Sequence, residues 1–289
     1  MKKKFRLLIT VFIAGLGFLA VMVVVMLKLI DRQTYDQPVW NVLLVDQTAE
    51  QASNNVLLLQ YFPQENKIKS WDVDPETEVK VIGGYQEYQL RAVYPLLKIE
   101  KKSDHFIRAA LSQNLKVILD EVWPVTSLSR VDSRDKLKFQ FNQILWSQHA
   151  SLKQRLLSVG LLLKLTVQDA VAEFGQVGSG SLSRLSQELS KHQTEYGECS
   201  VAVINTTKTN HLGRGIADFL GTQGFRVVRV EDNLDRLPVT QIIWSGSESK
   251  CQALSDRIAK SLPSDKVEVD SDTALQNRAE IVIFLGEDL

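Results

Sequence analysis

The chain has 289 residues, 44% of them hydrophobic, and its 34 Lys and Arg residues balance its 34 Asp and Glu residues. This length allows one large or two ordinary domains, each with its own core. The balanced charge excludes the strong electrostatic bias of a nucleic-acid-binding protein, so we expect no nucleic-acid partner. Two cysteines are too few for a scaffold built from disulfides.

The N-terminal segment carries the clearest signal. Residues 7–27 are 21 residues without a charge, and they follow a basic tail, Lys2–Arg6. A helix of this length crosses a hydrocarbon core of about 30 Å, and the positive-inside rule places the basic tail in the cytoplasm. A cleaved signal peptide is the competing reading, but its apolar core is shorter, roughly 7–15 residues, and ends at a small-residue cleavage site. We therefore expect a cytoplasmic tail at 1–6, a single transmembrane helix at 7–30 and extracytoplasmic domains beyond it.

The first part outside the expected membrane span has a mixed pattern. Short apolar runs of β-favouring residues at 41–45 and 55–61 are followed, after a turn, by a run of period two at 68–73, which is typical of strands. Helical patterns come later, after Ser103 and over 134–148 and 151–164, and a further strand is predicted at 116–119. Strands followed by interleaved helices predict an α/β domain over residues 39–165.

A Gly- and Ser-rich stretch at 175–183 is the sharpest change of composition in the chain. Such a stretch cannot contribute much to a core, so we expect residues 166–197 to be a linker.

The last ninety residues have the most regular pattern. Strands are predicted over 199–205, 225–230, 239–244 and 279–286, with helices over 212–222 and 251–262. The order is β-α-β-β-α-β, with Val267–Val269 as an optional extra strand. We expect a small sheet with helices on one face, over residues 198–289.

This last unit resembles the LytR C-terminal domain of bacterial envelope proteins. The matching features are the strand Val201–Thr206, the helix Gly213–Leu220, the strand that follows Gly224, and the closing Ile281–Asp288. The family usually has Asn-Gly-Thr after its first strand, whereas this chain has Asn205–Thr207, without the glycine.

Residues 39–125 resemble a degenerate LytR–CpsA–Psr domain. Asn41–Val45 corresponds to the opening strand of that family, Asp74–Val79 to its Pro-Arg-Asp-Thr-x-Val motif, and Gln89–Tyr94 to its Lys-Ile-Asn-Ala-Ala-Tyr motif. The resemblance implies transfer of a wall glycopolymer from a polyprenyl-pyrophosphate carrier to peptidoglycan. That chemistry uses acidic residues to hold a divalent cation and arginines to neutralise the phosphate oxygens.

The departures from this motif argue against catalysis. Asn54 stands where the family has the acidic residue of Ser-Asp-Thr, and Pro75 stands where it has the arginine of Pro-Arg-Asp-Thr-x-Val. Of these positions, Glu76 alone keeps a carboxylate. We therefore expect no catalytic residues and no enzyme activity, and we name Glu76 and Arg91 as candidate ligand-binding residues. We expect no cofactor and no metal, because the acidic and histidine residues have no metal-ligand spacing.

The cysteines and tryptophans allow further expectations. Cys199 opens a strand and Cys251 opens a helix of the same small domain outside the membrane, where a disulfide persists; a bridge and two buried thiols are the two alternatives. Trp71, Trp123, Trp146 and Trp244 are spaced like core residues, and Trp40 is placed to act as an interfacial anchor.

The sequence thus predicts a membrane-anchored cell-envelope protein that binds or scaffolds at the cell wall. Its expected partners are the membrane, together with peptidoglycan, a wall glycopolymer or a protein of the wall-synthesis machinery. The alternative from the enzyme class is a phosphotransferase that acts on a polyprenyl-pyrophosphate carrier.

Overall fold

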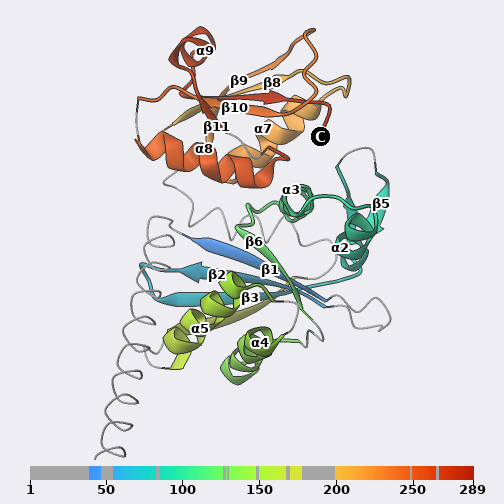
Figure 1. Cartoon of the computed structure of the whole chain (residues 1–289), viewed down its shortest axis with the longest axis vertical. Helices are drawn as coiled ribbons and strands as arrows, with labels where there is room; N and C mark the ends of the chain where they lie inside the picture. The colour runs from blue at the N-terminus through green and yellow to red at the C-terminus, as the bar shows by residue number, and fades with distance from the viewer. Residues whose placement is uncertain are drawn as a thin grey trace, which may run out of the picture.

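The structure is a computed structural model, and it describes residues 39–46, 55–82, 85–125, 128, 130–147, 150–166, 170–177, 199–247, 249–264 and 267–289. These residues form two five-stranded mixed sheets with helices packed against them (Figure 1). We refer to residues 39–177 as the N-terminal body and to residues 199–289 as the C-terminal body. The mixed α/β fold expected from the sequence is confirmed.

The sheet of the N-terminal body has the strand order β6-β1-β2-β3-β7. Strands β1, β2 and β3 are antiparallel neighbours, while β6 and β7 lie parallel to β1 and β3 at the two edges. The strand bounds are β1 Trp40–Asp46, β2 Val56–Phe62, β3 Lys67–Val73, β6 Glu121–Val125 and β7 Val171–Val177. All residues of β1 and β2 are buried, because both faces of the sheet are covered.

Helices cover the two faces of this sheet in pairs. One core lies under α2 and α3, and a second core on the opposite face is closed by α4 and α5. Figure 1 shows α4 and α5 on the side of the sheet turned away from the C-terminal body. The helix bounds are α2 Leu90–Ile99, α3 Asp104–Leu115, α4 Arg134–Trp146 and α5 Leu152–Thr166, and the short hairpin of β4 Glu78–Lys80 and β5 Glu87–Gln89 leads into α2.

Strand β7 lies inside the segment that we expected to be a linker. Residues 171–177 pair along their whole length with β3, so the N-terminal body extends beyond residue 165. The Gly-rich composition misled the prediction because Gly175 lies opposite Trp71, where a Cβ atom would come within 2.3 Å of the indole ring. A glycine in a strand often marks such a close approach.

The sheet of the C-terminal body has the strand order β11-β10-β12-β8-β9. Helices α7 and α8 share one core with one face of this sheet, and the short α9 contacts β10 and β12 from the other face (Figure 1). The predicted β-α-β-β-α-β order is therefore supplemented by β11 and α9. The bounds are β8 Ser200–Asn205, α7 Leu212–Thr222, β9 Arg226–Asp232, β10 Gln241–Trp244, α8 Ser249–Ser261, β11 Val267–Val269, α9 Ser271–Gln276 and β12 Ile281–Leu285.

A disulfide joins the start of β8 to α8. Cys199 and Cys251 are both fully buried, their Cα atoms are 5.8 Å apart, and the two sulfur atoms are bonded. Of the two alternatives that the sequence allowed, a disulfide and two buried thiols, the structure shows the disulfide.

The two bodies contact each other through α3 and α8. Lys260 Nζ lies 2.7 Å from Asp120 Oδ1, and the Arg257 guanidinium donates to the carbonyl of Val39 at 3.1 Å. Gln223 follows α7 and donates to the carbonyl of Lys116 at 2.7 Å, while its own carbonyl accepts from Ile118 N–H at 3.2 Å. Ile118 itself packs into the core of the C-terminal body.

A buried polar ladder crosses the N-terminal sheet and ends at this contact. Trp71 Nε1 donates to Gln60 (2.8 Å), Gln60 Nε2 donates to Asn41 Oδ1 (3.0 Å), and Asn41 N–H donates to Asp120 Oδ2 (2.8 Å). Polar groups buried in a sheet need such partners, since each unpaired one costs free energy. The ladder therefore links β3, β2 and β1 to Lys260 of the C-terminal body.

Two expectations concern membrane contacts. The span expected at residues 7–30 lies outside the described residues, and no helix within the described part of the chain is long and apolar enough to cross a bilayer. Trp40 is only 7% exposed and packs against Trp123 at 5.7 Å between ring centroids, so its expected role as an interfacial anchor is wrong. Trp146 was expected in the core and is 78% exposed.

Candidate functional site

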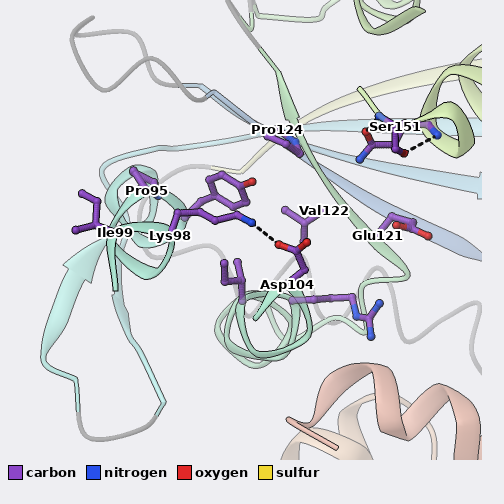
Figure 2. Close-up of a pocket in the computed structure, with 12 residues that line it drawn as sticks. Pro95, Lys98, Ile99, Asp104, Glu121, Val122, Pro124 and Ser151 are labelled. Atoms are coloured by element: carbon purple, nitrogen blue, oxygen red, sulfur yellow. Dashed lines mark hydrogen bonds and ion pairs between the residues drawn. The ribbon is translucent and has the colours of Figure 1, made fainter. Parts of the chain in front are cut away.

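A groove of about 740 Å³ runs along edge strand β6, between α2 and α3 on one side and the start of α5 on the other. Figure 2 shows side chains of all four elements converging on it. Its apolar surface comes from Tyr94, Pro95, Ile99, Ile107, Val122 and Pro124. Within the described residues β6 pairs only with β1, so its outer edge faces the groove.

The turn between α2 and α3 brings a charged pair to one side of the groove. Ser103 caps α3 by accepting a hydrogen bond from Phe106 N–H, which begins the helix one residue later. Asp104 then lies opposite Lys98 of α2, with 2.5 Å between Lys98 Nζ and Asp104 Oδ1 (Figure 2). This hydrogen bond raises the pKa of Lys98 above its ordinary value, outweighing the effect of burial.

A second group of charges lies deeper, beside the C-terminal body. Arg108 Nε donates to the carbonyl of Lys260 at 3.1 Å, and its Nη2 lies 2.6 Å from His105 Nδ1. Burial lowers the pKa of Arg108, while Glu121, Asp120 and Asp104 act in the opposite direction. Glu121, at the start of β6, accepts a hydrogen bond from Lys153 of α5. The C-terminal body therefore fixes one wall of the groove.

The groove combines an open apolar surface with charges of both signs. Such a surface fits an extended amphipathic chain that carries both ammonium and carboxylate groups, because neither sign dominates the lining. Pro124 has no N–H, so it leaves a gap in the donors along the strand edge.

The two residues expected to bind a ligand lie close to each other outside this groove. The backbone N–H groups of Leu90 and Arg91 donate to the carbonyls of Thr77 and Pro75, which fixes the turn after β3 against the start of α2. Arg91 Nη2 is 3.9 Å from Glu76 Oε1, and Arg91 Nε donates to Gln89 at 2.9 Å. Glu76 and Arg91 thus form an ion pair at the surface, and neither lines the groove.

Acidic residues gather at the end of β3. Asp72 Oδ2 lies 3.4 Å from Arg130 Nε. Burial raises the pKa of Asp72; Arg130 lowers it, and Asp132 and Asp74 raise it further. Asp132 itself accepts from Lys136 at 2.8 Å, a hydrogen bond that lowers the pKa of Asp132. Among the described residues, no group of three His, Cys, Asp or Glu side chains is arranged to hold a metal ion.

Sequence reasoning did not find the groove. Lys98, Asp104 and Arg108 come from two amphipathic helices whose pattern indicates only a buried face, and Pro124 lies in a strand that was predicted one segment too early, at 116–119. A groove built from four separate elements has no local sequence signal. Asn54 lies outside the described residues.

The comparisons with known proteins agree with the C-terminal pattern. Residues 198–289 match the family model described as LytR cell envelope-related transcriptional attenuator. The C-terminal body is therefore a domain of this family, and its recognition from the sequence is confirmed. The match covers the last third of the chain, and no curated protein matches the chain at a significant level of sequence similarity.

Solved structures give weaker likenesses. A transcriptional regulator from Enterococcus faecalis is 8% identical with a TM-score of 0.34, over 49% of this chain and 77% of that one. TagU from B. subtilis is 11% identical with a TM-score of 0.34, over 54% of this chain and 97% of TagU. The LytR-CPS2A-psr family protein YwtF (TagT), solved with bound octaprenyl pyrophosphate lipid, has a TM-score of 0.25 at 9% identity, over 49% of this chain and 78% of that one. Likenesses at this level carry no argument about activity.

Proposed function

We propose that this chain is a membrane-anchored, extracytoplasmic cell-envelope protein that binds a wall polymer in the groove beside β6, without catalysing a reaction on it. In this proposal residues 1–30 supply the cytoplasmic tail and the span, and the two bodies are separate domains outside the membrane. The envelope assignment is supported by the family of the C-terminal body.

The observation that carries the proposal is the lining of the groove. The groove has a volume of about 740 Å³, and its apolar side chains are accompanied by the ion pair of Lys98 with Asp104 and by the charged side chains of Arg108 and Glu121. Such a lining suits a glycan strand with peptide stems, because the sugar faces are weakly apolar and the stems carry both charges. The absence of catalysis is supported by Pro75, since no cation stands at that position, and by the pairing of Glu76 with Arg91.

Binding to insoluble peptidoglycan tests the proposal directly. The full chain in mild detergent is incubated with purified peptidoglycan and sedimented, and the bound fraction is measured against protein concentration. The test variant is Ile99→Glu, because Ile99 lines the groove and is 76% exposed, so the change leaves the core intact. The matched control is Leu275→Glu on α9, which is 78% exposed and lies outside the groove.

We expect Ile99→Glu to weaken sedimentation at least fivefold and Leu275→Glu to leave it unchanged. Equal binding by both variants would show that the groove is not the binding site. No enrichment of the unmodified chain over an unrelated membrane protein would remove wall binding altogether, and would favour a role as a protein-binding subunit of the wall-synthesis machinery.

The alternative is a transferase acting on a polyprenyl-pyrophosphate carrier. The motif resemblance around Glu76 and Arg91 favours it, and it requires cation-dependent binding of such a lipid that is lost in Glu76→Gln and Arg91→Ala. Binding by the unmodified chain that does not respond to Mg²⁺ or to these two substitutions would exclude this alternative.

A further inference from the structure

The outer face of the α4–α5 hairpin is apolar where a solvated helix pair is normally polar. Helix α5 places Leu157, Leu161 and Leu165 in the core, and a second apolar stripe runs along its opposite side: Leu152, Leu156, Val159 and Leu163. These four residues follow each other at intervals of four, three and four, which aligns them along one side of a helix. Leu152 is 71% exposed and Leu163 is 37% exposed.

Helix α4 adds aromatic side chains to the same surface. Leu137, Phe141 and Ile144 face the sheet, whereas Phe139 and Trp146, seven residues apart, are 55% and 78% exposed. Both helices pack on one face of the sheet through a common core, so their outer sides point in the same direction, away from the C-terminal body (Figure 1). The outer face of the hairpin, defined by Phe139, Trp146, Leu152, Leu156, Val159 and Leu163, is an unpartnered apolar surface in the described part of the chain.

The charge of the hairpin identifies what this surface fits. Residues 134–166 contain six Lys and Arg residues (Arg134, Lys136, Lys138, Lys153, Arg155 and Lys164) against the single acidic residue Asp135, although the whole chain is neutral. Asp132 and Glu121, from outside this range, pair with Lys136 and Lys153, and the hairpin still keeps a positive balance. Lys136 and Lys138 precede Phe139, and Lys153 follows Leu152. Apolar and aromatic residues flanked by basic ones are the pattern of a helix that rests in the headgroup region of an anionic membrane.

We propose that the outer face of α4 and α5 docks on the surface of an anionic lipid bilayer, with Trp146, Phe139 and Leu152 inserted at the level of the headgroups. A second copy of the chain would place two hairpins with the same positive balance of charge against each other, which is unfavourable, whereas anionic headgroups compensate that charge. The apolar side chains then leave water without needing a protein partner.

The membrane span of the proposed function keeps the docking face near the bilayer, and this tethering is the one step of the argument that rests on the proposed function. Eight residues, 31–38, separate the expected span from Val39, and even fully extended they reach about 27 Å at about 3.4 Å per residue. A weak surface interaction becomes effective at such a short tether, because the local concentration of lipid is high. The charge and the apolar face themselves do not depend on the anchor.

The test uses the fluorescence of Trp146. The full chain is reconstituted into phosphatidylcholine vesicles with about one third phosphatidylglycerol, whose acyl chains carry bromine near the headgroup as a short-range quencher. Residues 1–38 contain no tryptophan. Trp40, Trp123 and Trp244 are at most 8% exposed and Trp71 is partly buried, so Trp146, at 78%, is the most exposed tryptophan, and the variant Trp146→Phe isolates its contribution.

We expect the brominated anionic vesicles to quench the unmodified chain and to have little effect on Trp146→Phe. The double variant Lys136→Glu/Lys138→Glu is expected to lose at least half of the quenching, while the matched control Lys80→Glu/Lys208→Glu, with the same change of charge at exposed positions outside the hairpin, keeps it. Equal quenching of the unmodified chain and Trp146→Phe would overturn the proposal, as would quenching that is the same in vesicles of pure phosphatidylcholine.

Extraction with alkaline carbonate distinguishes the docking proposal from the proposal of a transmembrane anchor. If alkaline carbonate washes the chain from the vesicles, the chain has no membrane span and the anchor proposal is wrong. Added to preformed brominated vesicles, the same chain is still expected to show quenching of Trp146. If the chain resists extraction and Trp146 is not quenched, the anchor stands and the docking face is wrong.

Discussion

At the scale of single residues, burial disfavours the ionised form of Asp72 at the end of β3. Asp72 is mostly buried, and only Arg130, which is itself 55% exposed, opposes the effect of burial on its carboxylate. A carboxyl group whose pKa is raised by folding destabilises the folded state wherever it is ionised.

Asp72→Asn is therefore expected to stabilise the protein at pH 7, by up to about 1 kcal/mol after allowance for solvent. The gain should disappear as the pH falls below the ordinary pKa of 3.8, where the unfolded chain is protonated as well. Denaturant titrations at pH 7 and pH 3.5 measure it. Asp132→Asn is the control of opposite sign, since a hydrogen bond from Lys136 lowers the pKa of Asp132; stabilisation of both variants would contradict the assignment.

Gly175 is the second residue with a specific expectation. A Cβ atom at this position would overlap the Trp71 ring, so Gly175→Ala should displace β7 or the indole and cost about 1–3 kcal/mol of unfolding free energy. Gly221→Ala, where a Cβ atom meets nothing within 4 Å, is the control and should cost nothing. Urea titrations in which both variants match the unmodified chain would show that β7 is not packed as described.

At the scale of elements, the disulfide fastens α8 to the sheet that it covers. Cys199 and Cys251 are 52 residues apart, and a loop of this length reduces the entropy of the unfolded chain by an amount worth about 4 kcal/mol in the chain-entropy model. The double variant Cys199→Ala/Cys251→Ala should therefore lose about 2–4 kcal/mol, measured by chemical denaturation without reductant. The unmodified chain denatured with reductant should match it, and a difference between the two would mean that the alanines, not the lost bond, cause the effect.

The elements also show what the sequence could predict. The C-terminal strands and helices have strong periodicity and good boundaries, so their order was found, and α9 was missed because six residues are too few to show a period. In the N-terminal body, Gly175 concealed β7. The strand β6 was predicted too early because the segment before it is apolar: Val117 and Leu119 pack into the N-terminal core, and Ile118 packs into the core of the C-terminal body. Such tertiary contacts leave no local signal. The motif resemblance singled out Glu76 and Arg91 as candidate ligand-binding residues, and the structure places them beside each other, whereas nothing in the sequence indicated the groove.

At the scale of the whole molecule, Asp120 holds the two bodies together. Burial alone would raise the pKa of Asp120, but Lys260, Arg257 and the hydrogen bonds from Lys260 and Asn41 outweigh it and lower the pKa. A carboxylate with a lowered pKa stabilises the fold above its ordinary pKa of 3.8, and this contribution is lost as the pH falls through the folded-state value.

Asp120→Asn is expected to cost about 2–4 kcal/mol at neutral pH, because it leaves Lys260 without its buried partner. The loss should shrink as the pH falls from the ordinary pKa of 3.8 toward the lower folded-state pKa, because the unfolded chain takes up its proton first. Hydrogen exchange of α3 and α8 should speed up in this variant and not in the exposed control Asp235→Asn. Unchanged exchange at both helices would mean that the contact does not depend on this charge.

The contact of Arg257 with Val39 has a mechanical consequence. Val39 directly precedes β1, and the hydrogen bond from Arg257 ties its carbonyl to α8, at the point where tension from the N-terminal side would enter the fold. A pull on the chain at Val39 is therefore resisted by both bodies at once, through the strand pairing of β1 and through Arg257 of α8.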